Sequence, residues 1–387
     1  MINLGLSAAN LAALTKTFTA PAYRSTLSVQ IADISGHVLS NVSALMTDGQ
    51  IDVDNTADVT RSLSLTLTDA SGTLPFDTNS PADTALYFDR EIWVDLKVVI
   101  AQTTTVVTIP LFRGPVTKLD RTGASVSVEA QGREVYYMGS VWTPVSYPAG
   151  RKKTDVIRGL LASGNRMYKP LSSWLSIPSA TATIGKPVQL AQTDAIWTTV
   201  RTLAAGMSQQ LFWDAAGICR LRPSSTTIAW TFQGVSGPAN GDMQIGYSDN
   251  VVNAVYVIGG TPKGAKNPVT ATAVAASTHP LSPQRVGRYI LPGGGAYEDD
   301  TILTTKDAKA KAQQLLTQDM LQTVTVSFDA VPMWLLDPLD TCRVITNLGT
   351  VTFSLQKFSI PLNAGEPMSI GYNRDLSVAK TVRKNVK

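Results

Sequence analysis

The sequence contains few charged residues for its length. Asp, Glu, Lys and Arg make up 16% of the 387 residues, whereas about 25% is usual in soluble domains. A surface short of charge is typical of a protein that neighbouring proteins cover, although a Ser- and Thr-rich β protein without partners has the same bias. Hydrophobic residues make up 44% of the sequence, which is enough for a sizeable core. We therefore expect other protein to cover much of the surface.

Cysteine and histidine are scarce as well. Cys219 and Cys342 lie far apart, with no CxxC pair and no Cys/His cluster, so the spacing indicates neither a disulfide framework nor a zinc site. We interpret them as small buried hydrophobic residues in a protein made in a reducing cytoplasm. His37 and His279 stand in Gly-, Ser- and Pro-containing loops, away from any GxSxG or HExxH motif. A catalytic triad or a zinc protease is therefore not supported.

Acidic residues form two groups that could serve a glycosidase, which needs a pair of carboxylates. Both groups lie in turn contexts, where Asp commonly accepts hydrogen bonds from the backbone. Aromatic residues make up only 7% of the sequence, too few for an aromatic-lined sugar cleft, and no calcium-loop pattern occurs. We predict that the protein is not an enzyme and has no catalytic, cofactor-binding or metal-binding residues. The two groups are Glu298, Asp299 and Asp300, and Asp337 and Asp340.

Long apolar runs are absent too. No stretch of eighteen apolar residues occurs, so we expect no stable membrane insertion. The N-terminal stretch has no basic region and is interrupted by polar residues, so it does not resemble a signal peptide. The net charge is +4, and basic residues are concentrated in the tail 376–387. Such a tail predicts a solvated end rather than a nucleic-acid-binding face, and we expect no sequence-specific binding of nucleic acid.

The period-two alternation of apolar residues is the main positive signal. After an N-terminal segment 1–24, with a short helix, it predicts half-buried strands separated by Gly-, Asn- and Pro-containing turns. Short antiparallel strands at this spacing are typical of a barrel or sandwich, so 25–140 is predicted as a first β-barrel domain. The strands are expected at 27–33, 62–69, 92–98 and 124–130.

A mixed α/β middle region is predicted at 141–310. A helix is expected at 151–164 with Thr154 as its N-cap. A helix-plus-hairpin unit at 193–223 follows, in which Thr193 or Asp194 caps a helix that Gly206 ends. We expect this unit to close a small core and to act as a clamp between barrels. The core residues expected are Ile196, Trp197, Leu203, Leu211, Phe212 and Ile218.

The last third of the chain combines a loop, a helix and a second set of strands. The Gly- and Pro-rich run 259–296 is predicted as a long loop or projecting arm. A helix follows that Thr304 or Thr305 can cap, with Asp307 in its first turn. Alternating strands then predict a second β-barrel domain at 311–375, together with strands from 208–258. The fold class expected is therefore mainly β with a few helices, two barrel-like domains being joined by the mixed region.

Three aromatic residues between 136 and 174 support a competing hypothesis. Trp142, Tyr147 and Trp174 could form an exposed platform for a sugar ring. The alternative function is then a cell-surface glycan-binding module or a hydrolase. Partial burial of these side chains against the barrel is the simpler interpretation.

The order of the parts resembles the baseplate-hub, or minor tail, proteins at the tip of long-tailed, siphovirus-like bacteriophages, particularly those of actinobacteria. The resemblance covers about 25 to 375 and lies in the order of the stretches, none of which is a catalytic signature. The stretches that carry it are 61–69 with 111–134, 194–223, 249–260 and 286–344.

This resemblance implies a homotrimer with two related barrels per subunit, so that three chains present six similar barrels to a six-fold tail tube. It implies a place at the virion tail tip, around part of the DNA channel, after assembly in the host cytoplasm. The partners implied are the distal tail protein, the tape-measure protein and the tail fibre or receptor-binding proteins. Because the sequence ends soon after the second β unit, any cell-wall hydrolysis is expected in another chain.

Overall fold

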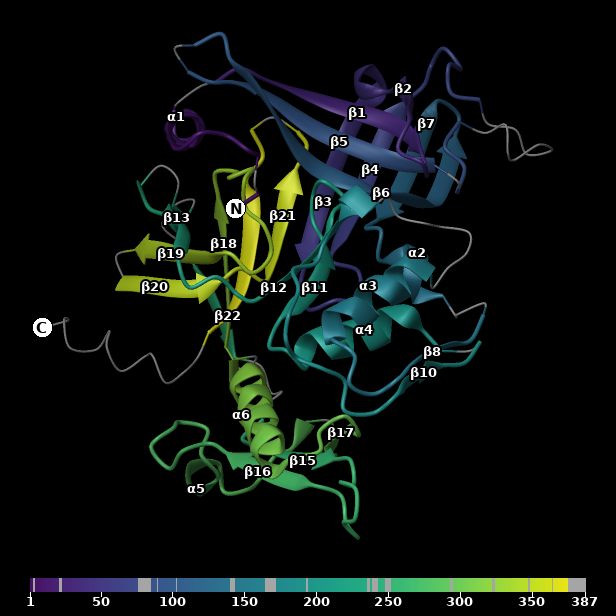
Figure 1. Ribbon diagram of the computed structural model, residues 1–387. Helices are drawn as coiled ribbons and strands as arrows, with labels where there is room; N and C mark the ends of the chain where they lie inside the picture. Colours follow the sequence, from purple (N-terminus) through teal and green to yellow (C-terminus); the bar gives the residue numbers. More distant parts are fainter. Residues whose placement is uncertain are drawn as a thin grey trace, which may run out of the picture.

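One antiparallel sheet of eleven strands runs through the computed structural model (Figure 1). The described residues are 1–2, 4–20, 23–75, 85–88, 90–101, 103–139, 143–163, 172–192, 194–234, 237–238, 243–247, 252–292, 295–321, 324–346, 349–363 and 365–374. The strand order is β14-β18-β22-β21-β3-β4-β7-β6-β5-β1-β2. The first β unit supplies β1 (Ser25–Asp33), β2 (Val38–Asn41), β3 (Met46–Asp54), β4 (Arg61–Thr68), β5 (Arg90–Val99), β6 (Val106–Thr122) and β7 (Ser125–Gln131). The rest are β14 (Gln244–Tyr247), β18 (Val324–Ala330), β21 (Lys357–Pro361) and β22 (Met368–Arg374).

The alternation in the sequence places apolar side chains on one face of these strands. In β4, for example, Leu63, Leu65 and Leu67 are buried, whereas the residues between them are partly or fully exposed. The long strand β6 pairs first with β5 and then with β7. Gly114 lies in the middle of β6, where a Cβ atom would meet the Gln131 carbonyl oxygen at 1.9 Å. Only glycine allows the two backbones this close approach.

The two β units share a sheet and a core. Strand β3 of the first unit pairs with β21 of the second, with Ile51 opposite Ile360, and both side chains are buried. The largest hydrophobic cluster contains residues from both units and from helix α1 (Ala8–Phe18). The mainly β class is therefore confirmed. Two separate closed barrels are not, because the described strands pair in one open series instead of closing into two rings.

A small three-stranded sheet packs beside the second β unit. It contains β13 (Ile228–Phe232), β19 (Thr341–Thr346) and β20 (Gly349–Ser354). Aromatic rings join it to the main sheet: Phe232 meets Phe328 edge-on at 5.4 Å, and Phe353 stacks on Tyr372 at 3.9 Å between ring centroids. Such pairs add stability beyond the burial of their area.

A second core forms in the middle of the chain. It contains the helices α2 (Val135–Met138), α3 (Lys153–Ser163) and α4 (Ile196–Ala205) and the hairpin β11 (Gln210–Trp213) and β12 (Cys219–Arg222). The short strands β8 (Val145–Tyr147), β9 (Leu175–Ser176) and β10 (Val188–Leu190) and the 3₁₀ turn Ser172–Trp174 lie around it. Helix α4 leads directly into the hairpin of β11 and β12, and Gly206 is the C-cap of α4.

The predicted N-caps of α3 and α4 are wrong. Helix α3 begins at Lys153, one residue before the predicted cap, and the buried Thr154 hydroxyl instead accepts a hydrogen bond from the Ala180 N–H at 3.3 Å. Helix α4 has Ala195 at its N-cap, without a side-chain hydrogen bond. The Asp194 carboxylate accepts from the Ala191 N–H at 2.8 Å, and Thr193 lies outside the described residues. In both cases the capping side chain is used by a neighbouring loop.

The run 259–296 is not a plain loop. It contains β16 (Thr270–Val274) and the short helix α5 (Pro283–Val286), and it leads to β17 (Tyr297–Asp299). Strand β15 (Ala254–Gly259) pairs with both β16 and β17, and helix α6 (Thr305–Leu321) packs on this sheet over a third core. The segment does project from the rest, at the lower end in Figure 1. None of the helices in the described part of the chain is long and apolar enough to cross a membrane.

Candidate functional site

Trp197 connects the second core to the first β unit. Its side chain is only 2% exposed, and the indole N–H donates to the Asp58 carbonyl oxygen at 2.7 Å. Asp58 belongs to the turn between β3 and β4, so one side chain spans two parts of the protein. Four of the six residues predicted for the clamp core lie in the second cluster, whereas Phe212 is buried outside it and Ile218 is half-buried. The four are Ile196, Trp197, Leu203 and Leu211.

A buried carboxyl group ties the same two parts together. Glu134 is fully buried, and its Oε1 accepts hydrogen bonds from the N–H of Thr60 at 3.3 Å and of Trp213 at 3.1 Å. Thr60 precedes β4, and Trp213 ends β11. Burial raises the pKa of Glu134 above its ordinary value, since a charged carboxylate is poorly solvated there. The group holds the β3–β4 turn against the hairpin.

A buried ion pair lies beside the turn of the hairpin. The Arg133 guanidinium donates to both carboxylate oxygens of Glu91, at 2.9 and 2.6 Å, and to the Gly217 carbonyl at 2.8 Å. It also stacks 3.7 Å above the ring of Trp174. This bidentate pairing compensates for burying both charges. It links β5, the turn before α2 and the β11–β12 turn.

A third ionic group lies where the two β units meet. The Arg61 guanidinium, at the start of β4, donates to Asp337 at 2.7 Å, and both side chains are buried. Arg222, at the end of β12, lies 3.4 Å from Asp337 and from Asp340 and also donates to the Pro338 carbonyl. Burial raises the pKa of Asp340. Residues from the first β unit, the hairpin and the second unit are thus held by one set of charges.

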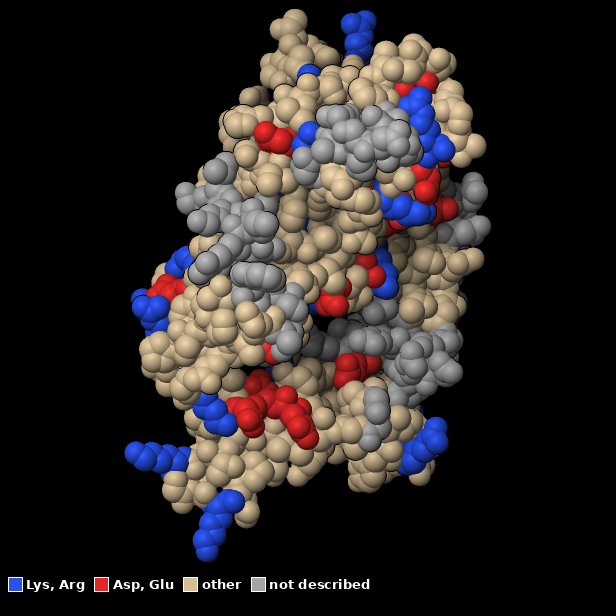
Figure 2. Space-filling model, turned by 90° about the vertical axis from the view of Figure 1, so that its right-hand side faces the viewer, with Lys and Arg blue, Asp and Glu red and all other residues tan. Residues whose placement is uncertain are grey.

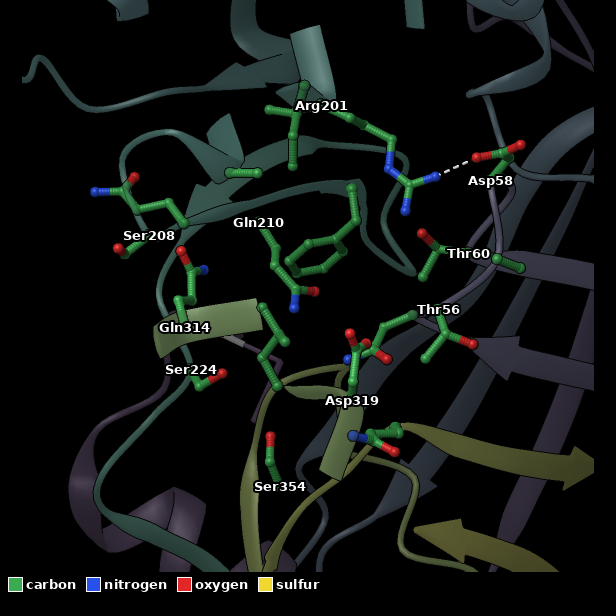
Figure 3. Close-up of a pocket in the computed structure, with 18 of the residues that line it drawn as sticks. Thr56, Asp58, Thr60, Arg201, Ser208, Gln210, Ser224, Gln314, Asp319 and Ser354 are labelled. Atoms are coloured by element: carbon green, nitrogen blue, oxygen red, sulfur yellow. Dashed lines mark hydrogen bonds and ion pairs between the residues drawn. The ribbon is translucent and has the colours of Figure 1, made fainter. Parts of the chain in front are cut away.

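A cleft of about 470 Å³ opens between these parts (Figure 3). Its walls come from the β3–β4 turn, from α4 and β11, from α6 and from the end of β20. On one wall Arg201 forms an ion pair with Asp58. Figure 3 shows the Asp319 side chain pointing in from α6 on the opposite side. Burial raises the pKa of Asp319, and no cation among the described residues offsets this rise.

The face drawn in Figure 2 carries its charges singly and in small groups. Basic and acidic side chains stand at scattered points on it, and an acidic group gathers beside a hollow in its lower half. Most of the face is neither acidic nor basic, as the composition predicts. The described residues of this face form no broad basic surface that could follow a phosphate backbone.

The cysteines and histidines singled out in the sequence do not come together. Cys219 and Cys342 are both buried free thiols, as predicted, and burial raises the pKa of Cys342 to about 12 and that of Cys219 well above its ordinary value. His37 is exposed and its Nδ1 lies 3.2 Å from Asp33. His279 is buried, and its Nδ1 accepts from the Leu281 N–H at 3.1 Å.

The candidate carboxylate pairs have structural partners. Asp337 and Asp340 belong to the buried ionic group, and the Asp340 carboxylate also accepts from the Asp337 N–H at 2.9 Å. The other group lies in and just after β17, where Asp299 accepts from Thr301, and Asp300 lies 3.5 Å from Lys186. Over the described residues, no three His, Cys, Asp or Glu side chains are grouped so as to hold a metal ion.

The aromatic residues proposed as a sugar platform are partly covered. Trp174 and Tyr147 are half-buried and pack against the second core, and the guanidinium of Arg133 covers one face of the Trp174 ring. Trp142 lies outside the described residues. The geometry therefore agrees with burial against the core better than with an open stacking surface.

Sequence reasoning missed the buried ionisable residues, of which Arg61 and Glu134 are examples. One signal existed for Arg61. It stands two residues before Leu63 in the alternating pattern of β4, on the face that the core buries. A charge at such a position predicts a buried partner. The identity of the partner, Asp337, could not be found this way because it is 276 residues away.

The fold is that of phage tail proteins. A prophage MuSo2 43 kDa tail protein from Shewanella oneidensis aligns with a TM-score of 0.59 over 91% of this chain and 98% of that one, at 12% identity. A tail protein from Neisseria meningitidis gives 0.57 over 90% and 97%, at 12% identity. The prophage tail protein gp18 from Listeria monocytogenes gives 0.53 over 92% and 97%, at 10% identity. No protein-family model and no curated protein sequence matches the chain.

Proposed function

We propose that this protein is a structural component of a phage tail and forms the trimeric hub of the tail tip. The observation that carries the proposal is the extent of the fold likeness, which covers at least 90% of this chain and 97% of each of three tail proteins. At 10–12% identity, this likeness concerns the fold. The architecture adds support, since its charged side chains brace one part against another.

The buried charges suit a rigid scaffold. Glu134, Arg133 and Arg61 each bind groups on other elements, and each lies where two parts of the chain meet. Buried ionic groups contribute little net stability but can fix one arrangement of parts against alternatives. A tail component must keep its shape while neighbouring subunits exert force on it, and we propose that these groups serve that purpose. The protein then acts by assembly and not as an enzyme.

The edges of the eleven-stranded sheet are the surfaces we propose for subunit contacts. Among the described strands, β2 pairs with β1 alone and leaves Val38 and Leu39 about half-exposed, at 48% and 52%. Strand β14 at the opposite edge leaves Ile245 44% exposed. Unpaired strand edges with apolar side chains readily accept another chain. In a trimer the two β units of each subunit would present six similar surfaces to a six-fold tube.

The same proposal gives the location and the partners. The hub would lie at the virion tail tip after assembly in the host cytoplasm and would surround part of the DNA channel. Its neighbours would be the distal tail protein, the tape-measure protein and the fibre or receptor-binding proteins. Contact with DNA in the channel would not depend on base sequence.

Multi-angle light scattering on the purified full chain tests the assembly. We expect a mass three times that of the 41.3 kDa chain. Leu39→Lys should shift the mass toward the monomer, because a charge at an edge opposes pairing. Ser64→Lys is the matched control. Ser64 is exposed but lies in β4, where it pairs with Gln50 of β3 on one side and with Glu129 of β7 on the other, so the mass of the assembly should not change.

A stable monomer at high concentration would contradict the trimer. A reducing-sugar release assay on host cell-wall glycan checks the alternative, that the protein is a hydrolase. We expect no release, and turnover that requires the folded chain would overturn the structural assignment.

A further inference from the structure

The cleft contains an acidic side chain in an unfavourable place. Asp319 lies in the last turn of α6, which carries no basic residue in that turn. Helix C-termini carry a partial negative charge, so a carboxylate there is repelled, whereas a cation would be stabilised. The side chain is also half-buried and forms no hydrogen bond or ion pair with any described residue. Its charge is therefore uncompensated within the part of the chain that the structure describes.

The other charged groups of the cleft do not compensate the negative charge of Asp319. Arg201 pairs with Asp58 on the opposite wall. The ammonium group of Lys311 lies 5.1 Å from the centre of the Tyr297 ring, on the side of the third core. The side-chain carbonyl of Gln209, another lining residue, is buried without a donor. A group that binds Asp319 should thus be a positively charged donor, such as an ammonium or guanidinium group.

A segment of the same chain offers that chemistry. Strand β22 ends at Arg374, which pairs with Val324 at the start of β18, five residues after Asp319. The chain therefore leaves the sheet next to the end of α6 that carries the cleft carboxylate. Residues 375–387 follow, and they contain one acidic residue and four basic ones, Lys380, Arg383, Lys384 and Lys387.

The distances allow the contact. Six extended residues from Arg374 to Lys380 span at most about 20 Å. Val324 and Arg374 face each other across one strand pair, so their Cα atoms are about 5 Å apart. The five residues back to Asp319 span at most about 17 Å even if they were fully extended. A basic side chain of the segment can therefore reach the cleft without any change in the described fold.

We propose that the cleft binds a lysine or arginine side chain from the basic C-terminal segment 376–387 of the same chain, with Asp319 as the carboxylate that receives it. The contact is intramolecular and does not depend on the tail assembly. It would pin the segment beside α6 and fill the space between the β3–β4 turn, the hairpin and the helix.

Carbodiimide cross-linking of the full chain tests the contact directly, because this reagent joins a carboxylate to an amine only when they touch. We expect mass spectrometry to find Asp319 joined to Lys380, Lys384 or Lys387. Mixing ¹⁴N- and ¹⁵N-labelled protein shows whether the joined residues share a chain. Cross-links from these lysines that are scattered over surface acids without Asp319, or that join only different chains, would overturn the proposal.

Limited trypsin digestion gives a second readout in variants that remain folded. Asp319→Asn keeps the shape of the side chain but removes its charge, so cleavage after Lys380, Arg383 and Lys384 should become about tenfold faster, as expected from the loss of one charge-assisted contact. Asp120→Asn is the matched control. Asp120 is exposed on β6 and pairs with Lys118, so the cleavage rate should stay at the original value. Equal rates in Asp319→Asn and the original protein would contradict the assigned site.

Discussion

At the scale of single residues, Trp197 is the clearest link between parts that are distant in sequence. It belongs to the second core, yet its indole N–H is satisfied by the Asp58 carbonyl in the first β unit, 139 residues away. Replacing it removes both a large buried ring and a donor for a half-enclosed carbonyl. Under the clamp hypothesis, Trp197 acts together with Arg201 of the same helix, which forms an ion pair with Asp58.

We expect Trp197→Ala to lower the free energy of unfolding by about 3–5 kcal/mol, since a large buried aromatic side chain is lost. Thermal melting followed by circular dichroism measures the effect as a lower midpoint. Trp197→Phe is the matched variant, because it keeps most of the ring but loses the N–H donor, and it should cost about 1 kcal/mol. An unchanged midpoint in Trp197→Ala would show that the side chain is not buried.

Single residues also show where sequence reasoning stops. The burial of Cys219 and Cys342 and the alternation of Leu63 and Leu65 follow from local pattern. The partner of Arg61 does not, since an ion pair depends on which strand lies opposite after folding. By sequence Asp337 is a candidate for half of a catalytic pair, whereas in the structure its side chain pairs with Arg61.

At the scale of elements, the sequence leaves two candidates for the N-cap of α6. Both Thr304 and Thr305 satisfy the sequence rule for an N-cap. The structure selects Thr304, whose hydroxyl accepts from the Asp307 N–H at 3.1 Å and donates to the Asp307 carboxylate at 2.7 Å. Thr305 is already the first residue of the helix.

We expect Thr304→Ala to destabilise α6 by about 1 kcal/mol, the usual cost of losing an N-cap. Hydrogen–deuterium exchange of the first turns of the helix measures the change. Thr305→Ala serves as the control, because alanine at the first helical position costs nothing in propensity, and exchange there should not increase. The reverse ranking of the two variants would mean that Thr305 caps the helix.

The predicted caps of α3 and α4 failed for an identifiable reason. Thr154 and Asp194 are good capping residues by type, but each makes its hydrogen bond to a neighbouring loop, at Ala180 and Ala191. A capping side chain has more than one donor within reach once the loops are in place. Local sequence identifies the helix, whereas the surrounding loops decide how its end is satisfied.

At the scale of the whole molecule, the two β units are continuous. The pairing of β3 with β21 carries the sheet from one to the other, and the buried side chains of Ile51 and Ile360 stand opposite each other at this point. Both units contribute to the same hydrophobic cluster. We therefore expect them to unfold together.

Ile360→Ala tests this cooperativity. Loss of a buried isoleucine side chain should cost about 2–5 kcal/mol. Hydrogen exchange should then accelerate in β4 and β7 of the first unit as well as in β18 of the second. Val257→Ala in the third core is the control, and its effect should be concentrated in β15 and β16. Unchanged protection in β4 and β7, with faster exchange in β18, would mean that the units unfold independently.

Local pattern in the sequence determined the class of the protein and most of its strands and long helices, because alternation and helical periodicity report which side of each element is buried. It also predicted the helix-plus-hairpin unit and the likeness to tail proteins. Only the tertiary structure decided that β3 joins β21, that the run 259–296 contributes β16 to a small sheet, and that Arg61 meets Asp337. These features are contacts between residues far apart in the chain. A local pattern shows which side of an element is buried, but it carries no information about which distant residues will pack against that side.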